Sequence, residues 1–184
     1  MKFCSVCGGS VRVAIPDGDD RPRHLCDACD TVHYQNPKLI AGCIPVWRDR
    51  ILLCRRAIEP RKGYWTLPAG FMEMGETIAE AARREAHEEA LVDVRIGEIF
   101  TIFSLPHISQ VYFFFRAEMT DERYAAGPES LEVRLFDEHE IPWDELSFET
   151  VRRSLQFFVE DRRSGQFQLR VEDIARDPRR VFER

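Results

Sequence analysis

Four cysteines near the beginning of the chain constrain its fold more strictly than any other feature of the sequence. Cys4 and Cys7 form one Cys-x2-Cys pair, Cys26 and Cys29 form a second, and 18 residues separate the two pairs. Each pair lets two sulfurs reach one ion, and a soft divalent metal favours thiolates, so two pairs at this separation are typical of a four-thiolate zinc site. The spacing predicts a zinc ribbon over residues 1–34, a module too small for its own core that would fold on its metal.

Other roles for the cysteines are open but less well supported. A disulfide framework or a redox pair would use the same residues, but the stretch from Met1 to Gly9 lacks the long apolar core of a secretory signal. We therefore expect the chain to work in the cytoplasm, where disulfides are rare. His24 and His33 could be alternative ligands, but four thiolates already complete a tetrahedron, and we expect both to be ordinary polar residues. Cys43 and Cys54 lie in apolar, strand-like runs, where buried inert thiols are expected.

After residue 34 the sequence alternates between strand-like runs and two helical segments. The strand-like runs cover residues 39–47, 50–56, 92–105, 109–119 and 131–138, and the helical segments cover residues 77–90 and 147–165. Pro68 and Gly70 interrupt regular structure before the first helix, and the tail 166–184 is charged and only weakly patterned. This order predicts a mixed α/β domain over residues 35–184, with a mixed sheet, a C-terminal helix and a tail.

Charge and hydropathy argue against two classes of partner. The formal net charge is −6, whereas a general nucleic-acid binder is more often basic. No run approaches the roughly 18 apolar residues that a membrane-spanning helix needs. We therefore expect neither a nucleic acid nor a membrane to be a partner.

The helical segment 77–90 gathers carboxylates on one face. With about 100° of rotation per residue, Glu88 lies roughly 60° to one side of Glu85 and Glu89 roughly 40° to the other. Small residues follow on the neighbouring arc and would let the helix lie close to a sheet: Ala79, Ala82, Ala86 and Ala90. Like charges at this spacing repel, and the helix dipole disfavours anions near its C-terminal end, so stability does not explain the cluster. A hard cation such as Mg²⁺ would explain it, and a solvated acidic face is the alternative.

The spacing around this helix resembles the Nudix box, Gly-x5-Glu-x7-Arg-Glu-hydrophobic-x-Glu-Glu-x-Gly-hydrophobic. Gly70, Glu76 and the run Arg84–Glu89 fill every charged position, and Val92 fills the last hydrophobic one. Leu91 stands where the second glycine is usual. It either adopts a left-handed backbone at a cost of about 1 kcal/mol or makes the helix end differently. The stretches HYQNPKLIAGCIP, WTLPAGFME, LPHISQVY and PESLEVRLFDEHEIP also resemble the zinc-ribbon Nudix group that includes ADP-ribose pyrophosphatase-like proteins and plant FAD pyrophosphatases.

The resemblance implies a Nudix fold, with a mixed sheet sandwiched between helices, and hydrolysis of the pyrophosphate bond in a nucleoside diphosphate derivative. Bound Mg²⁺ or Mn²⁺ would shield the pyrophosphate and activate water. By the same resemblance, four groups would hold these ions: the Gly70 carbonyl, Glu85, Glu88 and Glu89. Arg84 would orient a carboxylate through a charge-assisted hydrogen bond, and Glu76 would support the same site. A salt bridge within the helix is the alternative role for both.

The general base and the phosphate contacts are sought outside the box. Relatives often place the base on a later loop, so Glu132 is the preferred candidate, while Glu129 and Glu85 remain open. Arg55 is the first choice for meeting a phosphate, because its strand runs toward the box. Three further cations could share this role: Arg56, Arg61 and Lys62.

The substrate is narrowed by a comparison of motifs after the box. Gln110 and Tyr112 could touch a nucleoside, with core packing as the alternative for Tyr112. NADH pyrophosphatases resemble this chain but carry Ser-Gln-x-Trp-Pro-x-Pro-x-Ser, where residues 103–115 read FSLPHISQVYFFF. We therefore expect ADP-ribose or FAD as the substrate, with NADH as the alternative. An inactive Nudix scaffold with a binding ribbon, or an mRNA-decapping enzyme, is disfavoured by the intact carboxylates and the lack of an evident basic groove. Relatives are commonly homodimers, and we expect one here.

Overall fold

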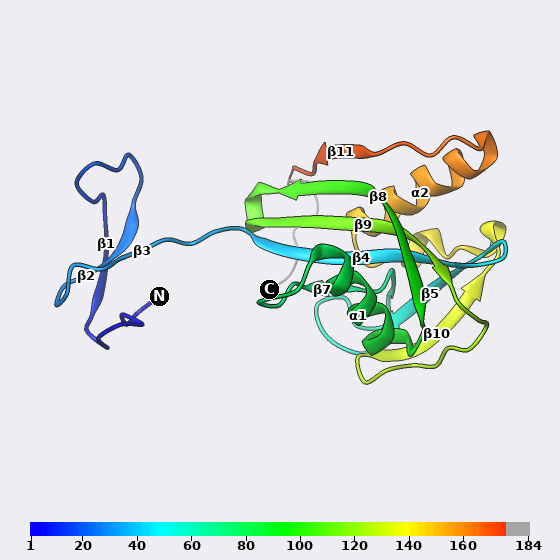
Figure 1. Ribbon diagram of the computed structural model, residues 1–184, viewed down its shortest axis with the longest axis horizontal. Helices are drawn as coiled ribbons and strands as arrows, with labels where there is room; N and C mark the ends of the chain where they lie inside the picture. The colour runs from blue at the N-terminus through cyan, green and yellow to red at the C-terminus, as the bar shows by residue number, and fades with distance from the viewer. Residues whose placement is uncertain (176–184) are drawn as a thin grey trace. The chain divides into compact units, whose positions relative to one another are not determined.

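The computed structural model describes residues 1–175, and the chain forms two compact units, Met1–Pro37 and Lys38–Arg184. The division falls a few residues after the boundary predicted at residue 34. The smaller unit is a three-stranded antiparallel sheet of β1 (Val11–Ala14), β2 (Arg23–Cys26) and β3 (Val32–His33) (Figure 1). Such a sheet buries little apolar surface, so its folding depends on the cysteines that flank its strands.

The larger unit is built on an eight-stranded sheet. Its strands are β4 (Lys38–Trp47), β5 (Arg50–Arg56), β6 (Trp65–Thr66), β7 (Ala69–Phe71), β8 (Val94–Leu105), β9 (Gln110–Met119), β10 (Ser130–Phe136) and β11 (Arg170–Asp173). The main order is β10-β5-β4-β9-β8-β11, while β6 pairs with β5 and β7 pairs with β4. β4 is parallel to β9 and β11 is parallel to β8, whereas the other pairs are antiparallel. The prediction of a mixed sheet is therefore confirmed.

Two helices cover opposite faces of this sheet, and each face has its own core. The helix α1 (Ile78–Ala90) lies on one face and α2 (Glu149–Ser164) on the other (Figure 1). Residues of β5 alternate between the two cores, because successive side chains in a strand point to opposite faces: Ile51 and Leu53 pack with α2, and Leu52 and Cys54 pack with α1. The central strands therefore read as continuous apolar runs. Cys43 and Cys54 are fully buried, as expected of inert thiols.

The ends of α1 follow from specific residues. Thr77 and Glu80 form a capping box at its start, in which the Thr77 hydroxyl accepts from the Glu80 amide at 3.2 Å and the Glu80 carboxylate accepts from the Thr77 amide at 2.8 Å. Leu91 ends the helix in the left-handed conformation, with φ 48° and ψ 33°, and its amide donates to the His87 carbonyl at 2.8 Å. Leu91 therefore adopts the left-handed backbone at an energetic cost, which is one of the two outcomes expected from the sequence. Gly165 ends α2 with φ 70°.

Several short elements were not predicted from the sequence. β6 and β7 flank Pro68 in the loop before α1, and β11 lies in the tail that reads as weakly patterned. Three single-turn 3-10 helices complete the unit: Pro106–Ile108, Glu138–Glu140 and Trp143–Glu145. The rest of the predicted tail, residues 176–184, lies outside the described residues. None of the helices among residues 1–175 is long and apolar enough to span a membrane.

Candidate functional site

The four cysteines of the smaller unit converge on one point. The sulfurs of Cys4, Cys7, Cys26 and Cys29 all lie within 4.8 Å of one another. The Cys4–Cys29 and Cys7–Cys26 sulfur separations are 3.8 and 3.5 Å. A tetrahedron of sulfurs about 2.3 Å from a central zinc ion has edges of about 3.8 Å, so the cluster has the size of a zinc site.

Backbone amides around these sulfurs favour thiolates. The amides of Val6 and Gly9 donate to Cys4 and Cys7, and that of Ala28 donates to Cys26, each at 3.4 Å. Such bonds stabilise negative sulfur and suit a metal ligand. His33 Nε2 lies 3.3 Å from the Cys4 sulfur, so this histidine contacts a cysteine instead of standing apart as an ordinary polar residue.

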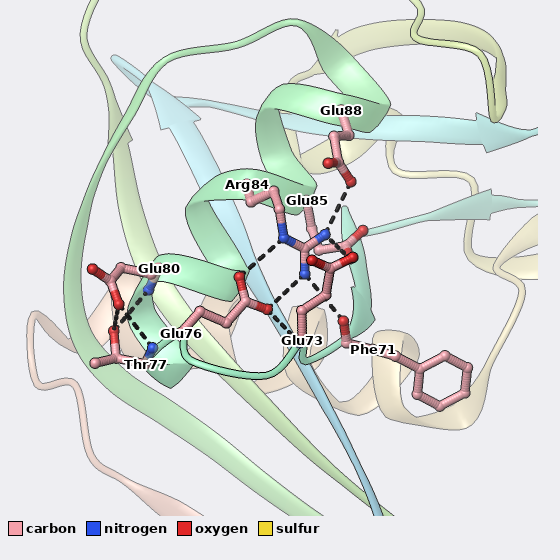
Figure 2. Close-up of polar contacts among 8 residues, drawn as sticks. All are labelled: Phe71, Glu73, Glu76, Thr77, Glu80, Arg84, Glu85 and Glu88. Carbon is pink, nitrogen blue, oxygen red and sulfur yellow. Dashed lines mark hydrogen bonds and ion pairs between the residues drawn. The ribbon is translucent and has the colours of Figure 1, made fainter.

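Arg84 organises the acidic face of α1 (Figure 2). Its guanidinium donates to both oxygens of Glu76 at 2.8 and 3.0 Å, to Glu85 at 2.7 Å and to Glu88 at 3.0 Å. The same group donates to the Phe71 carbonyl at 3.1 Å and so ties the helix to β7. One cation therefore fixes the orientation of three carboxylates, with an energy per bond roughly twice that of a neutral hydrogen bond.

Glu76 is the best satisfied of these carboxylates. Besides Arg84, it accepts from the Glu73 amide at 2.6 Å (Figure 2). The bonds to Arg84, and then the one from Glu73, lower the pKa of Glu76 to about 2. Glu76 is thus a permanent anion that anchors Arg84, which agrees with the supporting role expected for it.

Glu85 and Glu89 are buried and poorly compensated. Their exposed fractions are 8% and 7%, and one oxygen of Glu89 has no hydrogen-bond partner. Burial raises the pKa of Glu89 to about 8, and the Glu85 charge adds to this increase. Burial also raises the pKa of Glu85, against the opposing effect of Arg84. Two buried carboxylates in this state cost free energy unless a positive charge accompanies them.

Gly70 lies directly against the Glu85 carboxylate. A Cβ on Gly70 would lie 2.4 Å from the Glu85 carboxyl carbon, so a larger residue at position 70 would displace this carboxylate. The bare backbone, the unpartnered Glu89 oxygen and the exposed Glu88 carboxylate are oxygen donors of the kind that a hard divalent cation prefers. The chemistry of these donors therefore fits a Mg²⁺-type ion, although among the described residues only the four cysteines converge within 4.8 Å as placed.

A cavity of about 1050 Å³ lies on the α2 face of the sheet, and none of the α1 carboxylates lines it. Gly70 and Phe71 lie on its border, so the cavity reaches the strand that touches Glu85. Aromatic and aliphatic side chains from β9, from the loop before it and from the segment that leads into α2 form much of its wall, including Tyr112, Phe114 and Phe148. Cavities of this size and character hold drug-sized or cofactor-sized molecules.

The two arginines at the end of β5 differ in position. Arg56 lines the cavity, lies over the Phe148 ring at 5.2 Å, and its charge lowers the pKa of Glu89. Arg55, the sequence-based first choice, does not line the cavity. It donates to the Gly63 carbonyl at 2.9 Å and forms an ion pair with Glu132 at 3.6 Å.

The candidates for the general base also differ. Glu132 pairs with Arg55, and both side chains are about half exposed. Glu129 follows Gly127, whose amide donates to the Glu89 carbonyl at 3.0 Å, and its charge raises the pKa of both Glu85 and Glu89. Gln110 and Tyr112 both line the cavity, and the Tyr112 hydroxyl donates to the Gln110 side-chain carbonyl at 3.0 Å. The structure thus gathers Glu76, Glu85 and Glu88 around Arg84, with Gly70 against Glu85. Gln110 and Tyr112 lie on the wall of the cavity that Gly70 also lines, whereas Arg55 and Glu132 do not line it.

The fold and site together define an α/β protein that presents a carboxylate cluster beside a large cavity. The NUDIX domain model matches residues 36–157, and the Nudix N-terminal model matches residues 2–35. The chain therefore belongs to the Nudix hydrolase family, as its box, sheet and ribbon predicted.

Individual relatives share both units or the larger one. The crystal structure of a NUDIX hydrolase from Nitrosomonas europaea is similar with a TM-score of 0.94 and 52% identity, over 96% of this chain and 100% of that chain. The NAD-capped RNA hydrolase NudC of Photobacterium profundum is 35% identical over 121 residues, 64% of this chain. The match spans only 42% of that relative. An ADP-ribose pyrophosphatase of Methanocaldococcus jannaschii is 30% identical over 115 residues, 59% of this chain and 67% of that relative.

Proposed function

We propose that the protein hydrolyses the pyrophosphate bond of a nucleoside diphosphate derivative with Mg²⁺ or Mn²⁺, and that ADP-ribose or FAD is the substrate. The products would be AMP and a second phosphate compound. One observation carries the proposal: Gly70, which lines a large cavity, lies directly against the carboxylate of Glu85, one of the two buried, undercompensated acids of α1. A diphosphate bound at that border would share the cation with the acidic cluster.

Each residue of the cluster has a distinct part in this proposal. Gly70, Glu85, Glu88 and Glu89 would hold the cation, which supplies charge neutralisation at the phosphates and Lewis acidity. Arg84 holds Glu85 and Glu88 in place, and Glu76 holds Arg84. The substrate then meets carboxylates whose orientation is fixed beforehand, which lowers the entropic cost of assembling the reactive complex.

Arg56 is the cation best placed to receive a phosphate from the protein side. It lines the cavity, acts electrostatically on Glu89 and donates through Nε to the Pro60 carbonyl at 2.8 Å. Arg55 does not line the cavity and is engaged with Glu132 and Gly63, so the geometry favours Arg56. A guanidinium at this point offers paired donors that match two phosphate oxygens.

Glu129 is the better-placed general base. A base must reach a water molecule beside the phosphates, and the charge of Glu129 is felt by Glu85 and Glu89. The earlier preference, Glu132, forms an ion pair with Arg55 on an exposed part of β10. Glu132 and Glu85 are the alternatives. Measuring kcat for Glu129→Gln and Glu132→Gln distinguishes Glu129 from Glu132, because only the variant that removes the base loses kcat.

The remaining expectations concern the ribbon and the assembly. The four thiolates would hold a structural Zn²⁺, which suits the reducing cytoplasm. We propose a homodimer as the working form, to be checked by light scattering of the zinc-loaded protein.

NAD-type substrates form the second candidate class. Several relatives are named NAD-capped RNA hydrolase NudC, including the 35%-identical one from Photobacterium profundum. The acidic net charge and the FSLPHISQVYFFF stretch count against RNA and against NADH respectively. ADP-ribose and FAD therefore remain the preferred substrates in this proposal.

A substrate panel tests the proposal. ADP-ribose, FAD, NADH, diadenosine polyphosphates, NAD-capped RNA and mRNA-type capped RNA are each incubated with Mg²⁺ or Mn²⁺, and release of AMP or its equivalent is measured. Glu88→Gln and Glu89→Gln should lower kcat about a hundredfold or more. Glu118→Gln is the matched control, because Glu118 is exposed and paired with Arg95. Turnover that survives in both Glu88→Gln and Glu89→Gln, or no cleavage of any substrate, would refute the proposal.

A further inference from the structure

The amino-terminal end of α2 opens on the cavity without a side-chain cap. Phe148 is the N-cap residue and caps through no side-chain hydrogen bond, and the first backbone bond of the helix runs from the Arg152 amide to the Phe148 carbonyl. Phe148, Thr150 and Val151 all line the cavity. An uncapped helix start concentrates partial positive charge and attracts anions.

Two hydroxyl groups at the same place have no partner. Ser147 and Thr150 line the cavity, and their exposed fractions are 4% and 2%. Among the described residues, neither hydroxyl oxygen has a hydrogen-bond partner. Both oxygens are shielded from solvent as placed, so a bond to a ligand in the cavity requires rotation about χ1. A buried hydroxyl without a partner is destabilising, and a ligand in the cavity would supply the missing bond.

Comparable hydroxyls elsewhere in the larger unit are satisfied. Thr101 and Ser154 are both fully buried and lie 3.0 Å apart, and the Thr66 hydroxyl donates to the Leu67 carbonyl at 3.1 Å. The unpaired state is therefore particular to the start of α2. It is not a general feature of buried hydroxyls in this fold.

Arg56 connects this point with the acidic cluster. Its guanidinium lies 5.2 Å from the Phe148 ring, and its charge also lowers the pKa of Glu89. Arg56 thus contacts the N-cap residue of α2, and its charge also acts on the buried carboxylate of α1. The acidic residue in the first turn of α2, Glu149, forms an ion pair with Arg153 at 3.1 Å and does not leave that end with an unbalanced negative charge.

We propose that Ser147, Thr150 and the amino-terminal end of α2 form a subsite for phosphate oxygens of the substrate. They would bind the phosphate that the cation held by the α1 carboxylates does not contact, and Arg56, which lines the same cavity, would share that phosphate. The inference rests on the proposed pyrophosphate hydrolysis and adds a binding role for α2.

A kinetic experiment tests the subsite with Thr150→Val and Ser147→Ala. Each removes one hydroxyl and should raise KM for the substrate about tenfold, while kcat stays within about twofold. Thr101→Val is the matched control, because its hydroxyl is buried but paired: it should lower stability and leave KM unchanged. Thr150→Val should not lower the melting temperature of the free protein. An unchanged KM in both Thr150→Val and Ser147→Ala would overturn the inference.

A binding experiment without divalent ions separates this inference from the proposed function. Inorganic pyrophosphate and adenosine are titrated into zinc-loaded protein in citrate-free buffer with magnesium and manganese omitted, and heat is recorded. Thr150→Val should weaken pyrophosphate binding about tenfold and leave adenosine binding unchanged. Equal weakening for adenosine, or no change for pyrophosphate, would overturn the anion subsite. If this pattern holds while the substrate panel shows no cleavage, the proposed hydrolysis fails and the subsite stands.

Discussion

Gly127 lies in the loop that covers the C-terminal end of α1, and replacing it with alanine should lower both stability and kcat. The Gly127 amide donates to the Glu89 carbonyl at 3.0 Å, and the Ala125 amide donates to the Ala90 carbonyl at 2.9 Å. These bonds satisfy carbonyls that a helix end otherwise leaves free. A Cβ on Gly127 would lie 1.7 Å from the Glu88 carbonyl oxygen, whereas real Cβ atoms stay at least 3.0 Å away. Gly127→Ala therefore moves the loop by about 1.3 Å or more.

The magnitude follows from what that movement breaks. Two backbone hydrogen bonds are lost at about 1 kcal/mol each, so the free energy of unfolding should fall by about 2 kcal/mol. Glu129 is two residues further along and moves with the loop. A displacement of about 1 Å in a reacting group can cost up to a hundredfold, so we expect kcat to fall at least tenfold if Glu129 is the base.

Urea denaturation followed by circular dichroism measures the first quantity, and AMP release measures the second. Gly97→Ala is the matched control: the same side chain is added, but the nearest atom is the Arg116 carbonyl oxygen at 3.1 Å. It should change stability by less than about 0.5 kcal/mol, the usual range away from special sites. A Gly127→Ala protein that unfolds like the Gly97→Ala protein and keeps its kcat would refute the reasoning.

Three further outcomes are expected. Leu91→Gly should raise the free energy of unfolding by about 1 kcal/mol in urea, because glycine relieves the left-handed strain of a half-exposed leucine. Asp161→Asn should lower it by about 2 kcal/mol at pH 7, because buried Asp161 accepts two bonds from Arg170 at 2.5 and 2.6 Å. Arg170 lowers the folded-state pKa of Asp161, so the advantage of wild type holds above pH of about 4, the unfolded pKa, and shrinks as pH falls further. Cys26→Ser should lose one equivalent of zinc and expose residues 1–37 to protease, while the melting transition of the larger unit persists.

Local patterns in the sequence predicted the helices and the acidic face well. The 3.6-residue period of α1 placed Glu85, Glu88 and Glu89 together and set the alanines against the sheet, because both relations depend only on neighbours within two turns. The same holds for the end of α2 at Gly165. The short strands β6 and β7 were missed because pairing with β5 and β4, not their own composition, makes them strands.

The phosphate and base candidates depended on information that no local pattern carries. Adjacent residues of a strand point to opposite faces, so the choice between Arg55 and Arg56 requires the exact pairing of β5 and the position of Phe148. β10 carries a register shift between Ser130 and Glu132, and such a bulge re-aims the side chains beside it. The local sequence GPESLEVRLF predicts neither the strand register nor the bulge.

The excess of negative charge on the acidic face of α1 makes additional contacts necessary to stabilise this helix. Arg84 carries one positive charge and contacts Glu76, Glu85 and Glu88, so the carboxylates outnumber it. Glu89 has no ion-pair or hydrogen-bond partner for one of its buried oxygens, which adds to the deficit. Such a helix would be unstable alone, and its capping box, its alanine packing and the loop over its C-terminal end offset that cost. The stability that the rest of the fold supplies lets this face stay electrostatically incomplete, which is the condition that the proposed metal-dependent phosphate site would need.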